Sequence, residues 1–465
     1  MKDKNFLFTA VGGKNFTTNL VKRLIKTFDI SNAYATIDDA AEDISIFKET
    51  IRIWDAFVAK YPENMYYPFD RGQRDSISEY AIEVIQQISR NGNYDYERRV
   101  NEYYAHLCFW DNFLDTRKIS FVVFSYLPHE SYDYVIYLLC KKKNIPTCMC
   151  YEDLPMRLLT SKGYYMMEKL EEPYVEIEDV YKKLKAKCEA NIECGKGVEE
   201  YIEKVKKKFE NVENKKIKLF NNDRKTKIRR DYEDPREGFT QWRKKSINAR
   251  QFLNIMYVYG MGVYKSMKLA RKYEKIAETP IYTDKYVYYA LHYQPECTSS
   301  PLGGIYANQM LAIKVLASSL PENVWLYVKE HPVQTSFCRE KTYYEELKKI
   351  PKVKLISQRI PSEILMKNAV AVASLTGTVF LETQIIQKPC ICMGYSPRII
   401  LNGIYKIDTL EECKNALREI VDGKEKVTTI QELKLFFNAM EECCFDTYNE
   451  QEVYEKYCTY IKKYM

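Results

Sequence analysis

An alternation of short apolar runs with helical segments over residues 285–394 limits the folds open to this chain more than any other feature. The runs are typical of buried strands: KYVYYAL (285–291), VWLYVK (324–329), VKLI (353–356), VAVASL (370–375) and PCICMG (389–394). Segments with helical spacing lie between them, at 307–320, 342–349, 361–368 and 379–386. Strand, helix and strand in this order predict right-handed parallel units, and so a doubly wound sheet with its loops at the carboxyl ends of the strands.

The first half of the chain repeats this order less regularly. Strands are expected at 6–11, 118–128 and 145–155, with helices at 17–28 and 132–143. A chain of 465 residues is also too long for one ordinary core, which favours two domains. The fold class is therefore α/β, with two Rossmann-type domains facing a cleft.

The segment between these halves is charged and helical. Residues 172–250 are poor in strand signals and are expected to form a helical insertion, and 251–273 read as one long helix. We therefore expect a first domain at 1–275 and a second at 276–430. The last residues, 431–465, are expected to form helices that cross back to the first domain.

Composition excludes several classes of protein. No stretch reaches the roughly 18 apolar residues of a membrane span, and the N-terminal MKDKNFLFTAVGG lacks the apolar core of a signal peptide, which predicts a cytoplasmic protein. The fourteen cysteines show no zinc-ribbon spacing. They are expected to be reduced core residues, with the pairs Cys148/Cys150 and Cys390/Cys392 each on one face of a strand.

Residues 203–230 carry twelve Lys/Arg and four acidic residues, a local net charge of +8 that exceeds the +7 of the whole chain. A solvated helix and linker would account for this run. A patch that holds the protein at an anionic membrane surface is the alternative. Phe209 and Phe220 are its only aromatic residues, which argues against nucleic-acid binding.

Three loops of the second half should emerge at the same edge of one sheet: His292–Glu296, Lys329–Pro332 and Ser374–Thr378. Pro332 ends the hydrogen bonding of its strand, which leaves His331 at the mouth of the sheet. The sequence SLTGT offers hydroxyls and backbone N–H groups at a helix start, which suits an anion, although plain capping would use the same residues. Glu382 lies one helical turn after Thr378 and could accept hydrogen bonds from a ribose, or could be an ordinary surface glutamate.

The first half offers carboxylates after two successive strands. His129 and Glu130 follow one strand, and Glu152 and Asp153 follow the next. A partly dry carboxylate there could act as a general base, whereas loop solvation or helix capping would need no chemistry. The sequence contains no Walker A motif, no G-x-G-x-x-G, no H-E-x-x-H and no D-x-D between strand residues, so a metal-anchored sugar-diphosphate enzyme is not expected.

The motifs LHYQPE (291–296), YVKEHP (327–332) and SLTGTVFLE (374–382) resemble those of bacterial capsule and surface-polysaccharide biosynthesis proteins, including Kdo transferases. The His-Pro and Ser/Thr motifs are also similar to those of bacterial sialyl- and polysialyltransferases. The resemblance implies a GT-B glycosyltransferase with a CMP-activated donor, a glycan or glycolipid acceptor, no metal and no other cofactor. By the same resemblance, His331 contacts the CMP phosphate, as do Ser374, Thr376 and Thr378, and Glu382 contacts the ribose.

The resemblance implies further residues at the nucleotide site, and the sequence departs from the related proteins at one position. His292, Glu296, Lys329, Pro332 and Gly377 belong to the same motifs and are expected at the nucleotide site. In the sialyltransferases the acidic pair that supplies the base is followed by glycine, whereas Glu152-Asp153 is followed by Leu154, so Glu130, Glu152 and Asp153 all remain candidate bases. Two other functions stay open. One is a teichoic-acid-type transferase that takes CDP-glycerol, and the other is a non-catalytic capsule assembly subunit held at the membrane by residues 203–230.

Overall fold

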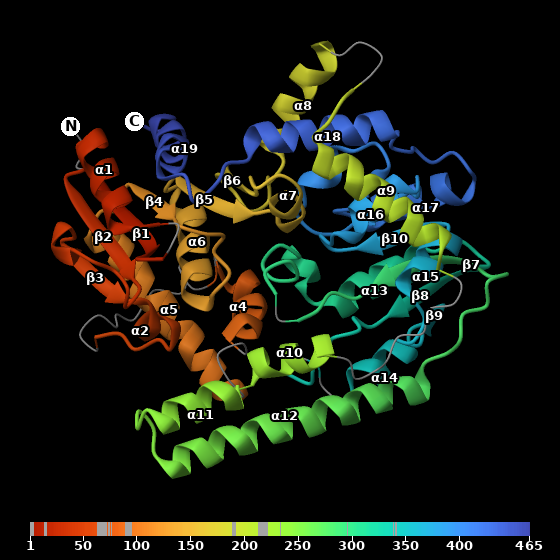
Figure 1. Ribbon diagram of the computed structural model, residues 1–465, viewed down its shortest axis with the longest axis horizontal. Coiled ribbons are helices and arrows are strands. Elements are labelled where there is room, and N and C mark those ends of the chain that lie inside the picture. Colours follow the sequence, from red (N-terminus) through yellow and green to blue (C-terminus); the bar gives the residue numbers. More distant parts are fainter. Residues whose placement is uncertain are drawn as a thin grey trace. The chain divides into compact units, whose positions relative to one another are not determined.

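The computed structural model describes residues 4–13, 16–62, 72, 75, 77–88, 95–187, 192–212, 222–232, 234–294, 296–337, 339 and 342–465. Its contacts divide the chain into two compact units, Met1–Tyr201 with Lys434–Met465, and Ile202–Leu433. Each unit contains a six-stranded sheet (Figure 1). The predicted α/β class with two Rossmann-type sheets is confirmed, while the placement of the units around a cleft stays a prediction.

The first sheet has the strand order β3-β2-β1-β4-β5-β6, parallel except for β6. Its strands are β1 (Asn5–Val11), β2 (Asn32–Ile37), β3 (Glu49–Arg52), β4 (Phe121–Phe124), β5 (Thr147–Glu152) and β6 (Tyr164–Met167). The accompanying helices are α1 (Thr18–Phe28), α2 (Ile53–Phe57), α4 (Ala81–Ile88), α5 (Tyr96–Thr116), α6 (Ser131–Lys143), α7 (Leu154–Leu159), α8 (Val175–Lys187) and α19 (Glu450–Lys462). The alternation of side chains along each strand sends one set toward α1 and α19, as with Phe8 and Val123, and the other toward α5 and α6.

The second sheet has the order β12-β11-β10-β7-β8-β9 and all its pairings are parallel. Its strands are β7 (Lys285–Ala290), β8 (Val324–Lys329), β9 (Val353–Leu355), β10 (Ala371–Ser374), β11 (Cys390–Cys392) and β12 (Ile404–Lys406). Helices α12 (Ala249–Ile276), α13 (Gln309–Ser319), α14 (Tyr343–Lys348) and α17 (Leu410–Val421) share one core with the sheet. Helices α15 (Ser362–Asn368) and α16 (Val379–Ile385) contact β7, β10 and β11, and Tyr286 of β7 donates a hydrogen bond to the carbonyl of Leu365.

The charged middle of the chain forms α9 (Lys196–Glu210), α10 (Asn222–Asp231) and α11 (Pro235–Arg243) before α12. The predicted boundary at 275/276 differs from the contact division, which places α10, α11 and α12 in the second unit. The reason is packing. Tyr273 of α12 donates to the carbonyl of Ile356, and the buried Arg224 of α10 donates to the carbonyl of Pro332. Charge patterning marked these helices as different from the sheet but did not show which sheet they cover.

The C-terminal residues Lys434–Met465 group with the first unit by their contacts. Helix α18 (Ile430–Cys443) begins in the second unit and ends in the first, and α19 packs on β5, β6 and α1. Tyr460 of α19 donates a 2.8 Å hydrogen bond to the carbonyl of Met166 in β6. Among the described residues, no helix combines the length and apolar character needed to cross a bilayer.

The described cysteines are all free thiols. Cys148 and Cys150 lie on the same face of β5, in the core shared with α1 and α19, as their spacing predicts. Cys390 and Cys392 are likewise buried in β11. Burial raises the pKa of Cys390 to about 12, which keeps this thiol protonated and unreactive at neutral pH.

Candidate functional site

The order of the second sheet reverses between β7 and β10. The chain proceeds from β7 through β8 to β9 on one side and then returns to β10 on the other. Ligands of doubly wound sheets bind outside the carboxyl ends of the strands at such a reversal. The three predicted loops follow β7, β8 and β10, which are neighbours in the sheet, so the structure brings them together.

His292 joins the first loop to the third. Its Nε2 accepts a 3.4 Å hydrogen bond from the Thr376 N–H, and its Nδ1 lies 3.3 Å from the hydroxyl of Ser374. The ring is buried, and burial, aided by the charges of His331 and Arg339, lowers the pKa of His292 to about 3. The imidazole is therefore neutral at pH 7 and carries its proton on Nδ1, because Nε2 is an acceptor. His292 fixes the position of the Ser-Leu-Thr-Gly-Thr loop.

His331 lies at the end of β8, where the sequence predicts it, and it is half-buried. Its Nδ1 accepts a 3.4 Å hydrogen bond from the Val333 N–H, so Nε2 is the nitrogen that carries the proton in the neutral ring. Burial lowers the pKa of His331 to about 4, although Glu330 and Glu296 oppose this shift. In the ligand-free protein at pH 7, this histidine can donate one hydrogen bond from Nε2 but bears no charge.

The group that anchors this loop was not predicted from the sequence. Glu330 is 1% exposed and forms an ion pair with Arg339, whose Nε lies 2.8 Å from its Oε2. The same oxygen accepts a 2.8 Å hydrogen bond from Tyr344. Arg339 also donates to the carbonyl of His292 at 3.3 Å and to the side chain of Gln294, so one guanidinium connects the loops after β7 and β8.

A reciprocal amide pair strengthens the same connection. The Gln294 N–H donates to Oε1 of Gln334 at 2.9 Å, and Nε2 of Gln334 donates to the Gln294 carbonyl at 3.0 Å. Neither Arg339 nor Gln334 lies in a motif, and their hydrogen-bond partners could not be predicted from the neighbouring residues. The only sequence signal was Glu330, a glutamate directly after a buried strand. A carboxylate that is buried at such a position requires a partner for its charge.

The Ser-Leu-Thr-Gly-Thr loop differs in part from the predicted anion site. Ser374 and Thr376 are buried, and the Thr376 hydroxyl donates a 2.7 Å hydrogen bond to the carbonyl of Thr298. Thr378 is exposed, and its side chain makes no capping bond to α16. Gly377 lies against the His292 ring, since a Cβ there would be 3.4 Å from Nε2. Two of the three hydroxyls therefore support the loop in the ligand-free protein, and Thr378 is the hydroxyl that faces solvent.

Lys329 and Glu382 lie on the face of the sheet covered by α15 and α16. The Lys329 ammonium is buried and donates to the hydroxyl of Ser362 at 2.9 Å, and burial lowers its pKa to about 8. Glu382 binds the Nζ of Lys208 at 2.9 Å, and Lys208 also binds Glu363 at 3.1 Å. Glu382 is therefore an ion-pair partner and not a free surface glutamate.

The described part of the 203–230 run makes further contacts within the second unit. Lys227 binds Glu296 at 2.7 Å, and Arg224 donates to the Pro332 carbonyl and, at 3.1 Å, to Gln358. Glu296 and Pro332 were predicted at the nucleotide site, and each is held by a cation of this run. Residues 213–221 of the run lie outside the described residues.

The first unit holds the candidate bases at the carboxyl ends of β4 and β5, which are parallel neighbours. Glu130 lies 3.3 Å from Nε2 of His129 and is partly exposed. Glu152 is paired with Arg157, and Asp153 is buried and caps α7 by accepting a 3.1 Å hydrogen bond from the Met156 N–H. Asp153 thus caps a helix, and its role as a base stays a prediction.

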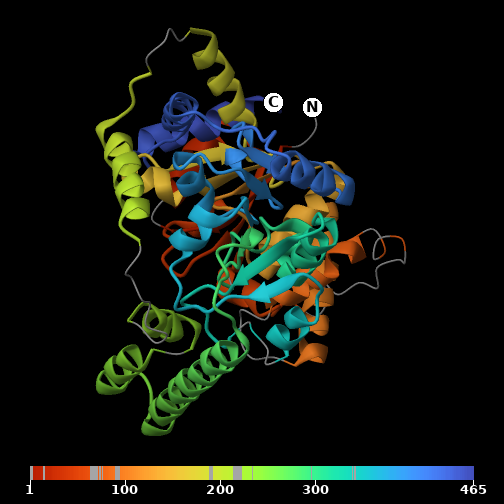
Figure 2. The ribbon, with the colours of Figure 1, turned by 90° about the vertical axis from the view of Figure 1, so that its right-hand side faces the viewer.

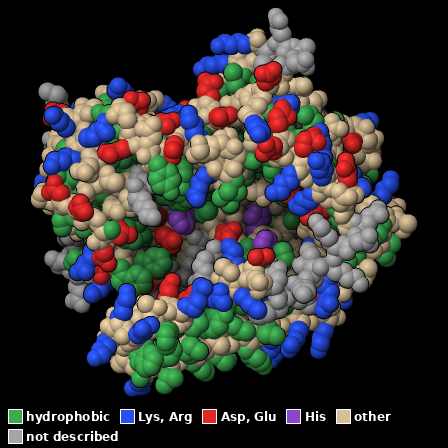
Figure 3. Space-filling view, viewed as in Figure 1, with side chains coloured by type: hydrophobic (Ala, Val, Ile, Leu, Met, Phe, Trp, Pro, Cys, Tyr) green, Lys and Arg blue, Asp and Glu red, His purple; other side chains and the backbone are tan. Residues whose placement is uncertain are grey.

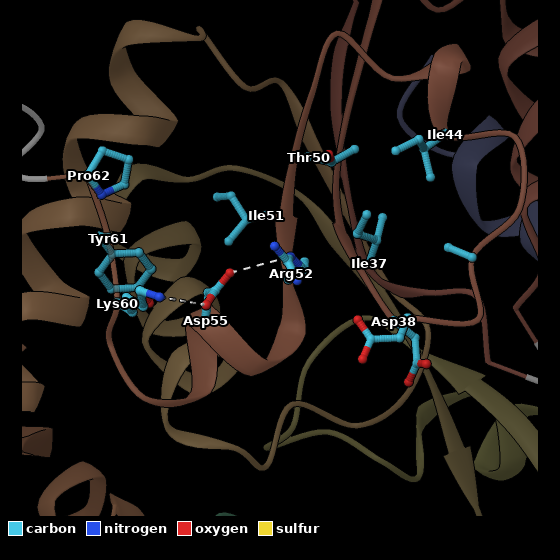
Figure 4. Close-up of a pocket in the computed structure, with 12 residues that line it drawn as sticks. Ile37, Asp38, Ile44, Thr50, Ile51, Arg52, Asp55, Lys60, Tyr61 and Pro62 are labelled. Atoms are coloured by element: carbon cyan, nitrogen blue, oxygen red, sulfur yellow. Dashed lines mark ion pairs between the residues drawn. The ribbon is translucent and has the colours of Figure 1, made fainter. Parts of the chain in front are cut away.

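A pocket of about 660 Å³ lies in the same unit, where β2 and β3 end (Figure 4). Its lining includes Asp38, Arg52, Asp55 and Lys60, and Asp55 lies between Arg52 at 3.7 Å and Lys60 at 4.0 Å. Neither strand was predicted from the sequence, because β3 is only four residues long and half-buried and β2, NAYATI, contains no continuous apolar run. Among the described residues, no group of three His, Cys, Asp or Glu could hold a metal ion. Metal independence stays a prediction.

Part of this chain matches one protein family. Two solved structures show similarity at TM-scores too low to support an argument. KpsC of Thermosulfurimonas dismutans, a β-Kdo 2,7 transferase, is 9% identical with a TM-score of 0.29, covering 93% of this chain and 89% of that one. UDP-GlcNAc 2-epimerase of Methanocaldococcus jannaschii is 12% identical with a TM-score of 0.27, covering 94% and 99%. No curated protein matches. Residues 259–419, which carry all three loops, match the model of the capsule polysaccharide biosynthesis protein family, and this confirms the resemblance seen in the motifs.

Proposed function

We propose that this protein is a capsule-polysaccharide glycosyltransferase that moves a sugar from a CMP-activated donor to a glycan acceptor without a metal ion. The sugar class we favour is a 2-keto acid sugar such as Kdo or a sialic-acid-like nonulosonate. The observation that carries the proposal is the meeting of the three loops at the reversal between β7 and β10, within the segment that matches the capsule family. A nucleotide at this reversal follows the general rule for doubly wound sheets.

In such a transfer the bond between the anomeric carbon and the phosphate oxygen breaks, and the electron pair leaves with CMP. Negative charge therefore grows on the phosphate while the sugar becomes oxocarbenium-like. His331 would donate a hydrogen bond from Nε2 to this phosphate. An approaching anion raises the pKa of an imidazole, so binding would also move His331 toward its charged form. A donor aimed at charge that develops in the transition state typically contributes about 10²–10³ in rate.

The other residues expected to contact the CMP-sugar have different roles in the ligand-free protein. Thr378 is exposed and open to a phosphate oxygen. Ser374 and Thr376 would act mainly by holding the loop against His292. Glu382, which pairs with Lys208 in the ligand-free protein, would accept hydrogen bonds from the ribose hydroxyls.

The acceptor hydroxyl must lose a proton as it attacks the sugar carbon. Glu130, Glu152 and Asp153 are the candidate bases, all at one edge of the first sheet. Of these, Asp153 is the most buried, and it is the first candidate to test.

Calorimetric titration of the purified protein with CMP, CDP, UDP and GDP, without added metal, tests the donor assignment. We expect micromolar binding of CMP that is lost in His331→Ala and retained in His129→Ala, the matched change of a half-buried histidine in the first unit. Tighter binding of UDP or GDP would contradict the CMP donor. Turnover of CDP-glycerol in place of a CMP-sugar would support the glycerophosphotransferase alternative, and no nucleotide binding would favour the assembly subunit.

A further inference from the structure

Two antiparallel amphipathic segments, α11 and the first half of α12, leave a large apolar surface in solvent. We propose that this hairpin, residues 235–264, binds the surface of anionic membranes with its apolar side chains inserted among the lipids. Six large apolar side chains of the hairpin are between 42% and 66% exposed: Phe239, Trp242, Leu253, Met256, Tyr257 and Tyr264. Figure 3 shows the hydrophobic side chains gathered over α11 and α12.

The exposed residues of α12 lie on one side of the helix. Leu253, Met256, Tyr257 and Tyr264 are spaced by three, one and seven residues, which places them along one stripe. Folded proteins rarely leave a contiguous apolar surface of this kind without a partner. Tyrosine and tryptophan, with an apolar ring and a polar tip, suit the boundary between lipid and water.

Close contacts at two glycines pack α11 and α12 against their neighbours. A Cβ on Gly238 of α11 would lie 2.9 Å from the side chain of Ile255, and one on Gly262 would lie 2.6 Å from the ring of Tyr232. The rings of Trp242 and Phe252 stack at 5.2 Å and 11°. The apolar surface is therefore present before any partner binds. The end of the hairpin extends away from the second sheet (Figure 2).

The charge around this surface identifies the partner. Residues 235–272 contain a single acidic residue, Glu237, and nine basic ones: Arg236, Arg243, Lys244, Lys245, Arg250, Lys265, Lys268, Arg271 and Lys272. Figure 3 shows Lys and Arg side chains along the border of the apolar surface. An apolar face with a basic border matches anionic lipid, and each cation near such a surface contributes to binding. A second copy would bring the same positive border against itself, which disfavours a symmetric dimer here.

The hairpin is a better membrane site than the 203–230 run. In the described part of that run, Lys208, Arg224 and Lys227 are occupied by partners within the second unit. Arg236 of the hairpin pairs with Asp234, and Lys272, further along α12, pairs with Glu345. Both ion pairs lie outside the segment 243–250, which spans the turn between α11 and α12. That segment carries Arg243, Lys244, Lys245 and Arg250 next to the apolar face.

Flotation of the full chain with large unilamellar vesicles tests the proposal without any nucleotide. We expect binding to phosphatidylcholine vesicles that contain 30% phosphatidylglycerol and much weaker binding to phosphatidylcholine alone. Lys244→Glu with Arg250→Glu should weaken binding by about 30-fold or more, since each cation contributes about fivefold. The matched control is Lys424→Glu with Lys426→Glu, which reverses two exposed lysines elsewhere in the same unit.

The apolar face has its own variant. Leu253→Ser with Tyr257→Ser should abolish flotation, whereas Ile82→Ser with Tyr448→Ser, at exposed positions in the first unit, should leave it unchanged. Vesicles should shift the tryptophan emission of the unmodified chain to shorter wavelength, and this shift should be lost in Trp242→Phe. Equal flotation of the hairpin and control variants, or no flotation of the unmodified chain, would overturn the proposal. So would a dimer in sedimentation velocity that is lost in Leu253→Ser with Tyr257→Ser. Nucleotide titration is independent of these results.

Discussion

Glu330 and Arg339 form an ion pair closed to solvent, with 2.8 Å between Oε2 and Nε and side-chain exposures of 1% and 2%. Glu330 directly precedes His331 in the chain, and the Arg339 guanidinium donates a hydrogen bond to the carbonyl of His292. A buried pair of this kind is costly to break, because the remaining charge has no partner. It therefore sets the geometry on which both histidines depend.

Removing one partner of this pair should destabilise the second unit strongly. Glu330→Leu or Arg339→Met alone should each lower the free energy of unfolding by about 3–5 kcal/mol, and the double variant should recover part of that loss. Urea denaturation of the four proteins gives the coupling energy directly. The exposed pair Lys349–Glu346 is the control, and its removal should cause no measurable change. Single variants as stable as that control would show that the pair does not hold the loops.

The buried histidine of the site predicts acid sensitivity. The folded pKa of His292 is about 3, lowered first by burial, whereas an unfolded histidine titrates near 6.5. The unfolded chain thus binds more protons than the folded one between these values, and stability falls as the pH falls through this window. From pH 7 to pH 5 the loss from this residue should be about 2 kcal/mol.

Urea midpoints at pH 7 and pH 5 measure this effect. His292→Gln should lower stability at pH 7 and also flatten the pH dependence of the second unit. His106, whose pKa burial lowers to about 3 in the first unit, should contribute separately there. An unchanged pH dependence in His292→Gln would show that another group is responsible.

CMP binding should take up protons at mildly acidic pH. In the ligand-free protein the pKa of His331 is about 4, so the ring is almost fully neutral at pH 6. A phosphate bound to its Nε2 favours the charged form and raises this pKa, so protons are taken from the buffer on binding. Calorimetric titrations with CMP at pH 6, in buffers of different ionisation enthalpy, give the number of protons taken up on binding. The uptake should disappear in His331→Gln; uptake of the same size there would assign it to another group.

Glu382 should distinguish a nucleoside from a bare phosphate. Glu382→Gln should weaken CMP binding by about tenfold or more, the loss expected for a hydrogen bond to a charged group, and should affect 2′-deoxy-CMP less. Glu363→Gln is the matched control, because both carboxylates bind Lys208. If both variants lose the same affinity, the position of Lys208 accounts for the effect and Glu382 does not contact the ribose.

Asp153→Asn separates catalysis from capping in the first unit. Asparagine caps helices about as well as aspartate, so the thermal stability of this variant should stay close to that of the unmodified chain. If Asp153 is the base, transfer should fall by about 10²–10⁴ while CMP affinity is unchanged. Parallel assays of Glu130→Gln and Glu152→Gln complete the comparison. Full activity of Asp153→Asn with a loss in one of the others would reassign the base.

Local pattern predicted the second sheet well because its strands are continuous apolar runs. Parallel strands covered on both faces show this pattern, so β7, β8, β10 and β11 could each be recognised without their neighbours. Pattern failed for β3, a four-residue, half-buried strand with little periodicity, and for β2, whose sequence NAYATI contains no continuous apolar run. The polar pocket beside these strands was missed for the same reason.

The sequence by itself determined that a histidine, a lysine and a Ser/Thr loop stand at strand ends that share one edge of a sheet. Strand ends and proline positions are local properties, encoded by neighbouring residues. The tertiary structure alone decided which of these groups support the loops and which stay open to a ligand. His292 is hydrogen-bonded to Ser374 and Thr376. Arg339, which pairs with Glu330, lies in a segment that contains no motif. Helices α10 to α12 belong to the unit of the second sheet. Such pairings depend on desolvation and on partners far along the chain, and neither can be read from a residue's immediate neighbours.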